Sequence, residues 1–80
     1  MEINLPPELG HISTAHLHLD IARLCELVAL GYEVDGEAVL SEGLWVVYGR
    51  STYDGEVILA EYTHAGEAAA VLEHVPTVLR

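Results

Sequence analysis

The chain contains no lysine and no phenylalanine, and only three arginines stand against 13 acidic residues. The formal net charge of the 80 residues is −10 at pH 7. A surface of this kind repels phosphate groups, which argues against direct binding to nucleic acids or to anionic membranes. The same charge favours protein partners with a basic surface.

Cysteine is also scarce, because Cys25 is the only one and the chain therefore forms no internal disulfide. Cys25 falls on the apolar face of a predicted helix, which is typical of a buried structural cysteine rather than a reactive one. No apolar run approaches the roughly 18 residues of a membrane-spanning helix, and the N-terminus lacks the pattern of a signal peptide. We therefore expect a cytoplasmic protein.

Apolar residues, by contrast, make up 51% of the chain, which predicts a folded protein with a core. The length suits one domain. Pro6 and Pro7 favour an extended backbone, and Gly10 follows them. The sequence thus predicts an extended N-terminal arm over residues 1–10 and a single small α+β domain over residues 11–80.

The first strong element is a helix over residues 13–30, with Ser13 as its N-cap and Gly31 as its C-terminal glycine. Its apolar positions fall on one helical face: Leu17, Ile21, Leu24, Cys25 and Val28. Residues 16–21 also alternate as a strand would, so a strand followed by a shorter helix capped by Asp20 is the competing interpretation. We favour the long helix, because no turn signal separates its two halves.

Residues 32–62 are rich in β-branched and aromatic residues and contain Asp-Gly pairs at 35–36 and 54–55. The second pair predicts a tight two-residue hairpin turn with positive φ at Gly55. The first pair fits either a hairpin or a short helix over residues 36–42 that ends at Gly43. A last helix is expected over residues 63–75, capped by Thr63 and stopped by Pro76.

These elements predict an α+β fold: a helix, an antiparallel β-meander of three to four strands, and a C-terminal helix packed on the sheet. With a two-residue turn at Asp54-Gly55, Val47 would face Tyr62 on the core side. The opposite side would then carry an apolar set: Leu44, Val46, Tyr48, Val57 and Leu59. That face is too apolar for simple exposure, so we expect either that a helix covers it or that it forms the interface of a homodimer.

The histidines offer the only metal-site pattern, with His11, His16 and His18 close to Asp20. On a strand His16 and His18 would point the same way, but on a helix they lie about 200° apart and cannot share an ion. The favoured helix therefore predicts no metal site, and no cofactor motif is present. The serines match no nucleophile motif and the glycines no phosphate loop, so we expect no enzyme activity.

An acidic cluster follows the first helix, formed by Glu33, Asp35, Glu37 and Glu42. Such a cluster is ordinarily a solvated acidic edge, and its functional interpretation is a docking surface for a partner protein with a basic surface. The sequence therefore favours a small acidic non-enzymatic protein–protein interaction module of the regulator, inhibitor, antitoxin or immunity type, with nucleic-acid mimicry as one variant. The alternative is a small metal- or ligand-binding protein that uses residues 11–20.

Overall fold

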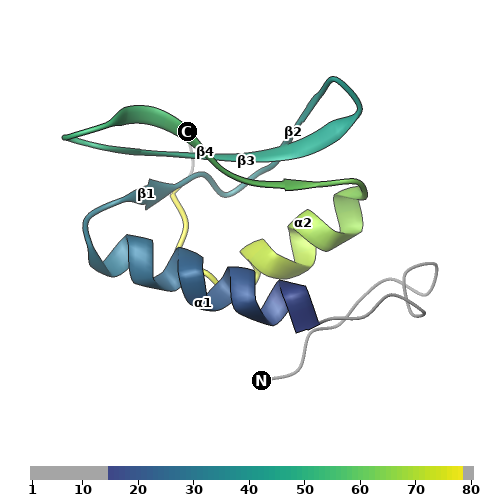
Figure 1. Cartoon of the computed structure of the whole chain (residues 1–80), viewed down its shortest axis with the longest axis horizontal. Helices are drawn as coiled ribbons and strands as arrows, with labels where there is room; N and C mark the ends of the chain where they lie inside the picture. The colour runs from purple at the N-terminus through teal and green to yellow at the C-terminus, as the bar shows by residue number, and fades with distance from the viewer. Residues whose placement is uncertain (1–14, 79–80) are drawn as a thin grey trace.

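The computed structural model describes residues 15–78, and the predicted N-terminal arm lies outside the described residues. The elements follow in the order α1 (Ala15–Ala29), β1 (Glu33–Val34), β2 (Val39–Ser41), β3 (Leu44–Ser51), β4 (Gly55–Tyr62) and α2 (Ala65–Leu72). Figure 1 shows both helices below the sheet. The predicted α+β fold is confirmed, with a helix, a four-stranded antiparallel sheet and a C-terminal helix that packs on it.

Helix α1 confirms the helical interpretation of residues 15–20 over the strand. Leu17, Ile21 and Leu24 recur with helical spacing and are buried, so this stripe anchors the helix on the sheet. The helix ends at Gly31, whose φ of +108° is accessible to glycine at little cost. The amide of Gly31 donates to the carbonyl of Val28 and that of Tyr32 to Leu27, which satisfies the last carbonyls of the helix.

Strand β3 is the centre of the sheet, with β4 on one edge and both β1 and β2 on the other. Strands β1 and β2 act as one edge strand that is broken at residues 35–38, because Glu33 pairs with Arg50 while Val39 pairs with Val46. The predicted hairpin or short helix at Asp35-Gly36 is wrong, since these residues lie in the break. Val78 forms a β-bridge with Asp35 at this break, and the amide of Gly36 donates a hydrogen bond to the carbonyl oxygen of Val78.

Both hairpin turns depend on residues with positive φ. Only Glu42 and Gly43 separate the paired residues Ser41 and Leu44, and their φ values of 51° and 83° suit a two-residue turn of the I′ type. The second turn was predicted as two residues at Asp54-Gly55, but Ser51 pairs with Gly55 across a longer loop. The predicted positive φ at Gly55 is confirmed at 65°. The Ser51 hydroxyl accepts hydrogen bonds from the amides of Tyr53 and Asp54, which tightens this loop.

A β-bulge in β4 changes which residues face the core. Val47 pairs with Ala60 and Tyr48 with Ile58, so Leu59 has no partner across the ladder. Two successive residues, Leu59 and Ala60, are consequently both buried, which a regular strand would not allow. The predicted pairing of Val47 with Tyr62 is wrong for this reason, because the longer turn and the bulge together shift the register.

Helix α2 is shorter than the predicted 63–75. Its N-cap is His64 rather than Thr63, and the cap makes no side-chain hydrogen bond. The Thr63 hydroxyl donates instead to a carboxylate oxygen of Glu67 at 3.3 Å. The helix ends at Leu72. Two turns follow it before Pro76, in which the amide of His74 donates to the carbonyl oxygen of Val71 and the amide of Val75 donates to that of Leu72.

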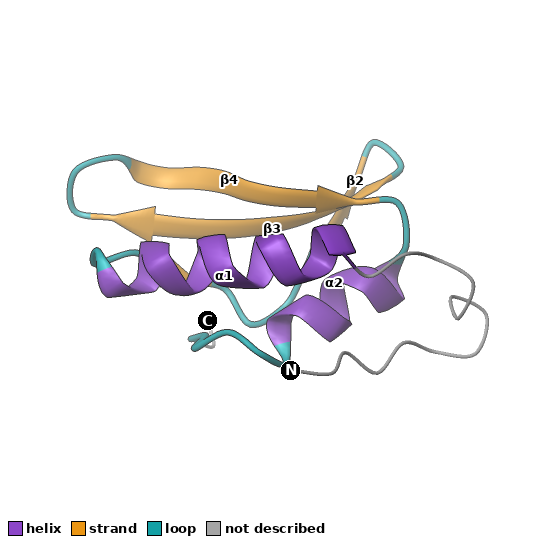
Figure 2. Cartoon of the chain, turned by 60° about the horizontal axis from the view of Figure 1, so that its bottom comes forward, coloured by secondary structure: helices purple, strands orange, loops and turns teal. Residues whose placement is uncertain are grey.

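Both helices lie on the same side of the sheet, as Figure 2 shows from a second direction. The core between the two layers is centred on fully buried side chains: Leu17, Ile21, Leu24, Val34, Val47 and Val71. The other side of the sheet therefore has no described helix over it. Within residues 15–78, neither helix combines the length and the apolar character needed to cross a membrane.

Gly49 should tolerate no side chain, because a Cβ there would overlap the Leu59 side chain and lie 2.7 Å from the carbonyl oxygen of Glu33. We expect Gly49→Ala to lower the free energy of unfolding by about 1–3 kcal/mol in urea titrations. The double variant Gly49→Ala/Leu59→Ala should lose less than the sum of the two single losses, because one of the two overlaps is gone. Additive losses would show that Leu59 does not occupy the space beside Gly49.

Gly55 has open space around it, so any effect of a substitution there reports the backbone alone. Gly55→Val should lower the free energy of unfolding by more than about 1 kcal/mol, because a β-branched residue resists positive φ. Thr52→Val, in the same exposed loop, is the control and should change stability little. An unchanged thermal melting curve for Gly55→Val would contradict the turn conformation.

Candidate functional site

The side of the sheet away from the helices is called the outer face, and its register follows from the strand pairs Val39–Val46, Leu44–Ser41 and Tyr48–Ile58. These pairs put five apolar side chains on one surface: Val39, Leu44, Val46, Tyr48 and Ile58. Ile58 is 55% exposed and Val39 is 52% exposed, whereas Val46 in the middle is only 3% exposed. A continuous apolar strip with exposed members thus runs across the central and edge strands.

The predicted interface set is corrected in two positions. Leu44, Val46 and Tyr48 lie on the outer face as expected, but Val57 and Leu59 do not. Leu59 is 7% exposed and belongs to the core, and Val57 packs against it. The bulge breaks the alternation along β4, which turns Val57 and Leu59 toward the helices and puts Ile58 on the outer face.

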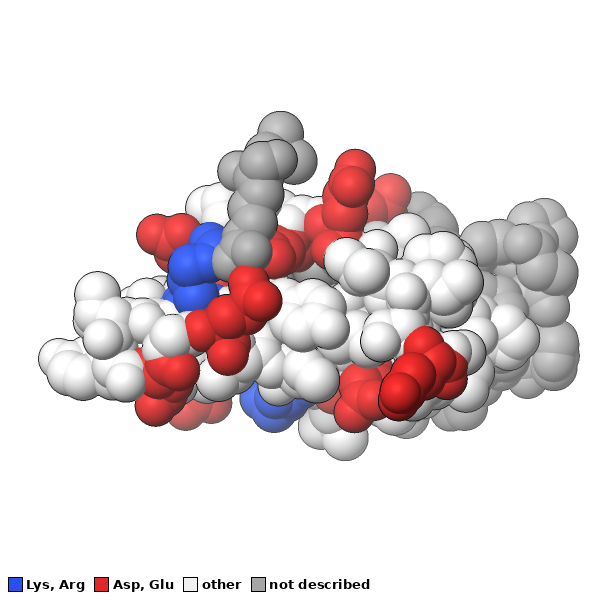
Figure 3. All heavy atoms as spheres, turned by 90° about the horizontal axis from the view of Figure 1, so that it is seen from above, with Lys and Arg blue, Asp and Glu red and all other residues white. Residues whose placement is uncertain are grey.

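Acidic side chains surround the apolar strip. Glu61 pairs with Val46 and Glu56 pairs with Arg50 on this face, and both glutamates are exposed. Figure 3 views the molecule from this side and shows red acidic groups around an uncharged area, with few blue groups. The rim therefore carries mostly negative charge.

The predicted acidic cluster is divided by the fold. Arg50 lies between Glu33 and Asp35, with nitrogen–oxygen distances of 3.0 and 2.6 Å, so a cross-strand arginine pairs with two of the four carboxylates and offsets one of their charges. This pairing could not be predicted from the sequence, because Arg50 lies far from both carboxylates along the chain. Glu42 is in the β2–β3 turn, and Glu37 is exposed in the break between β1 and β2. The four carboxylates are thus spread along β1, the break that follows it and the β2–β3 turn.

The histidines of the metal hypothesis are not brought together. His11 lies outside the described residues, and α1 carries His16 and His18 in helical positions that diverge. His16 Nε2 lies 3.1 Å from a carboxylate oxygen of Glu67 on α2, which is 5% exposed. Among residues 15–78 no group of three or more His, Cys, Asp or Glu side chains is arranged to hold a metal ion.

One face of α1 carries a polar network that ties this helix to β4 and α2. The Tyr62 hydroxyl donates to Asp20 at 2.7 Å, and Arg23 donates to the carbonyl oxygen of Leu59. Burial of the Tyr62 phenol, with the hydrogen bond to Asp20, raises the pKa of Tyr62 well above its usual value. These groups satisfy one another, so the network stabilises the packing of the elements rather than presenting reactive atoms.

Cys25 is half-buried on α1, and its thiol donates to the carbonyl oxygen of His74 at 3.6 Å. This contact places the cysteine between α1 and the segment that follows α2.

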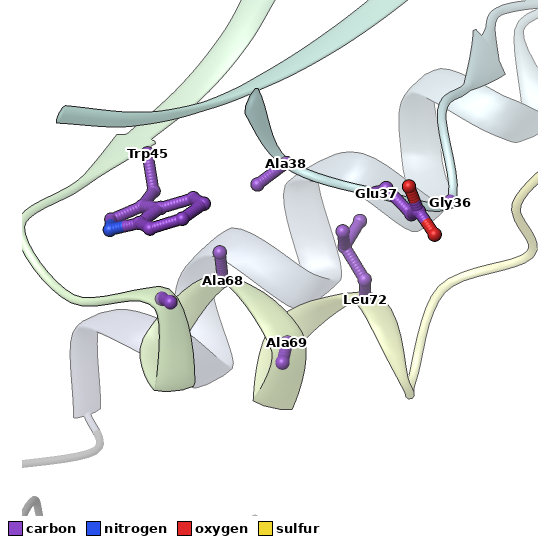
Figure 4. Close-up of a pocket in the computed structure, with 8 residues that line it drawn as sticks. Gly36, Glu37, Ala38, Trp45, Ala68, Ala69 and Leu72 are labelled. Atoms are coloured by element: carbon purple, nitrogen blue, oxygen red, sulfur yellow. The ribbon is translucent and has the colours of Figure 1, made fainter. Parts of the chain in front are cut away.

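A groove lies between the sheet and α2 and opens beside the break in the edge strand. Its volume is about 260 Å³. In Figure 4 the Trp45 indole lies over α2, with Ala38 beside it and Ala68 below it on the helix. The lining residues are Gly36, Glu37, Ala38, Trp45, Ala65, Ala68, Ala69 and Leu72. The small residues of α2 do not close this space, because alanines lie opposite a single tryptophan.

Comparison of this chain with protein-family models, with curated proteins and with solved structures finds no match.

The Tyr62–Asp20 hydrogen bond should make stability fall at alkaline pH. Because the pKa of Tyr62 is raised in the folded state, the phenol stabilises the fold fully below about pH 10, the pKa of an unfolded tyrosine, and this contribution is lost as pH rises above that value. Tyr62→Phe should cost about 1–3 kcal/mol at pH 7 and should weaken the alkaline loss, measured by urea titration between pH 7 and 11.

Two tyrosines serve as comparisons for this experiment. Tyr53 is 92% exposed, so Tyr53→Phe should leave the pH profile unchanged. The pKa of Tyr32 is also raised, by its hydrogen bond to Asp54. Tyr32→Phe therefore measures how much this second tyrosine contributes to the loss of stability at alkaline pH. A Tyr62→Phe profile that superimposes on the wild type would show that the buried phenol does not drive the alkaline loss.

Proposed function

We propose that the protein is a non-enzymatic protein–protein interaction module that binds a partner with a basic surface through its outer face. The observation that carries the proposal is the exposed apolar strip of the outer face, with Ile58 and Val39 more than half exposed and glutamates beside them. Both helices pack on the opposite side of the sheet, so they leave this strip open. A small regulator or inhibitor needs no more than such a surface.

The chemistry of the outer face suits a basic partner. Burial of the apolar strip supplies affinity at roughly 25 cal/mol per Å² before the cost of association is subtracted. Glu56, Glu61 and the net charge of −10 attract a basic surface and speed its approach. A partner whose basic groove normally holds nucleic acid has the same complementarity, which keeps the inhibitor, antitoxin and nucleic-acid-mimic variants within the proposal.

A second copy of the chain is the competing occupant of the outer face, and the sequence analysis expected such a homodimer. Two copies would each bring a charge of −10, so a dimer must overcome repulsion. The two occupants differ in their response to salt, because screening strengthens a complex of like charges and weakens a complex of opposite charges. Sedimentation of the purified protein at several salt concentrations therefore separates them.

Ile58→Ser tests the outer face directly. The partner is captured from the native cell, identified, purified and titrated against the wild type by calorimetry. We expect about a tenfold or larger loss of affinity for the variant, and weaker binding of the wild type as salt rises from low to moderate concentration.

Leu19→Ser is the matched control, because Leu19 is an equally large apolar residue, 73% exposed, on α1. It should bind within about twofold of the wild type, since surface changes outside an interface have small effects. Equal affinity of the Ile58→Ser variant, or a dimer that tightens with salt and excludes the partner, would contradict the proposal.

A further inference from the structure

The groove beside Trp45 has the size of a side chain rather than of a small molecule. Its volume of about 260 Å³ lies below the roughly 300–1,000 Å³ that ligands of drug size occupy. It is lined on one side by Gly36, Glu37 and Ala38, which lie in the break between β1 and β2. A side chain presented by another protein could therefore enter it without any movement of the core.

The groove is apolar along its length and negatively charged at one end. Trp45 and the methyl groups of Ala68 and Ala69 form the apolar walls, and Glu37 lines the end beside Leu72. Glu73 follows Ala69 by one helical turn and is exposed, so a second carboxylate lies on the same side of α2. Helix α2 also ends there, which adds the negative end of its dipole.

An arginine side chain matches a groove with apolar walls and a negatively charged end. Its aliphatic stem packs on apolar surface while its guanidinium remains polar, and the planar fork of the guanidinium meets a carboxylate through two hydrogen bonds. The described arginines of this chain are engaged elsewhere, because Arg23 donates to Leu59 and Arg50 pairs with Glu33 and Asp35. Neither arginine within residues 15–78 is therefore available to the groove.

We propose that the groove between Trp45 and α2 is a binding site for an arginine side chain of the basic partner. The stem lies between the indole of Trp45 and the alanines of α2, and the guanidinium binds the carboxylate of Glu37. This inference rests on the proposed function, because it identifies the side chain by which the partner is recognised on the helix side of the sheet.

Trp45 is the only tryptophan of the chain, so its fluorescence reports occupation of the groove. The full chain is titrated with the peptide acetyl-Gly-Arg-Gly-Arg-Gly-amide. Two further peptides carry lysine or the uncharged isostere citrulline in place of arginine. We expect a saturable change of Trp45 fluorescence, strongest for the arginine peptide, weaker for lysine and absent for citrulline.

Two variants place the peptide in the groove. Ala69→Leu puts a larger side chain at an exposed helical position that lines the groove, and it should abolish the fluorescence change without unfolding the helix. Glu37→Gln should weaken binding about two- to fivefold, as expected for an exposed ion pair. Their matched controls on α1, Ala22→Leu and Glu26→Gln, are also exposed and should bind as the wild type does.

The outcomes separate this inference from the proposed function. Ile58→Ser should leave peptide binding unchanged, because Ile58 lies on the outer face. No saturable binding up to about 10 mM peptide, equal binding of the citrulline peptide, or equal binding by the Ala69→Leu variant would overturn the arginine site, whereas partner binding through the outer face would stand. Loss of partner binding with Ala69→Leu, beside retained binding with Ala22→Leu, would support the arginine site.

Discussion

The contact between Leu59 and Gly49 determines how the sheet divides its side chains between two faces. Gly49 has no Cβ, and this leaves space on the central strand for the extra residue that the bulge inserts into β4. With Leu59 turned toward the helices, Ile58 is left on the opposite side and 55% exposed. The bulge in β4 thus determines which side chains of this strand lie in the core and which lie on the outer face. A regular hairpin would divide them differently.

The regular parts of this fold could be predicted from the sequence, because their signals are local. The spacing of Leu17, Ile21 and Leu24 with Gly31 after them defines α1, and the fold class follows from the order of the elements. The register of β3 and β4 could not be predicted. It depends on a loop one residue longer than the predicted two-residue turn and on a bulge that no residue type in the sequence indicates. The side chains that change face, Val57, Ile58 and Leu59, are those beyond that irregularity.

The candidate surfaces were predictable to a smaller degree, since they depend on contacts between distant segments. The apolar strip was partly identified, because Leu44, Val46 and Tyr48 alternate along a single strand. The acidic cluster was identified by proximity in sequence, but Arg50 reaches Glu33 and Asp35 from the neighbouring strand and changes its charge. The groove needs the spacing between Trp45 and α2, which arises only when sheet and helix meet. The two proposed surfaces lie on opposite sides of one sheet, so a single partner would have to reach around the edge formed by β1 and β2.

The bridge between Asp35 and Val78 has a consequence for the order in which the molecule is made. Strand β1 consists of two residues, and the amide of Val78 donates to the carbonyl oxygen of Val34 while the amide of Gly36 donates to Val78. Strand β1 is synthesised before both hairpins, whereas Val78, which hydrogen-bonds its outer edge, is synthesised after them. The sheet can therefore gain these edge hydrogen bonds only after all of its strands have been made.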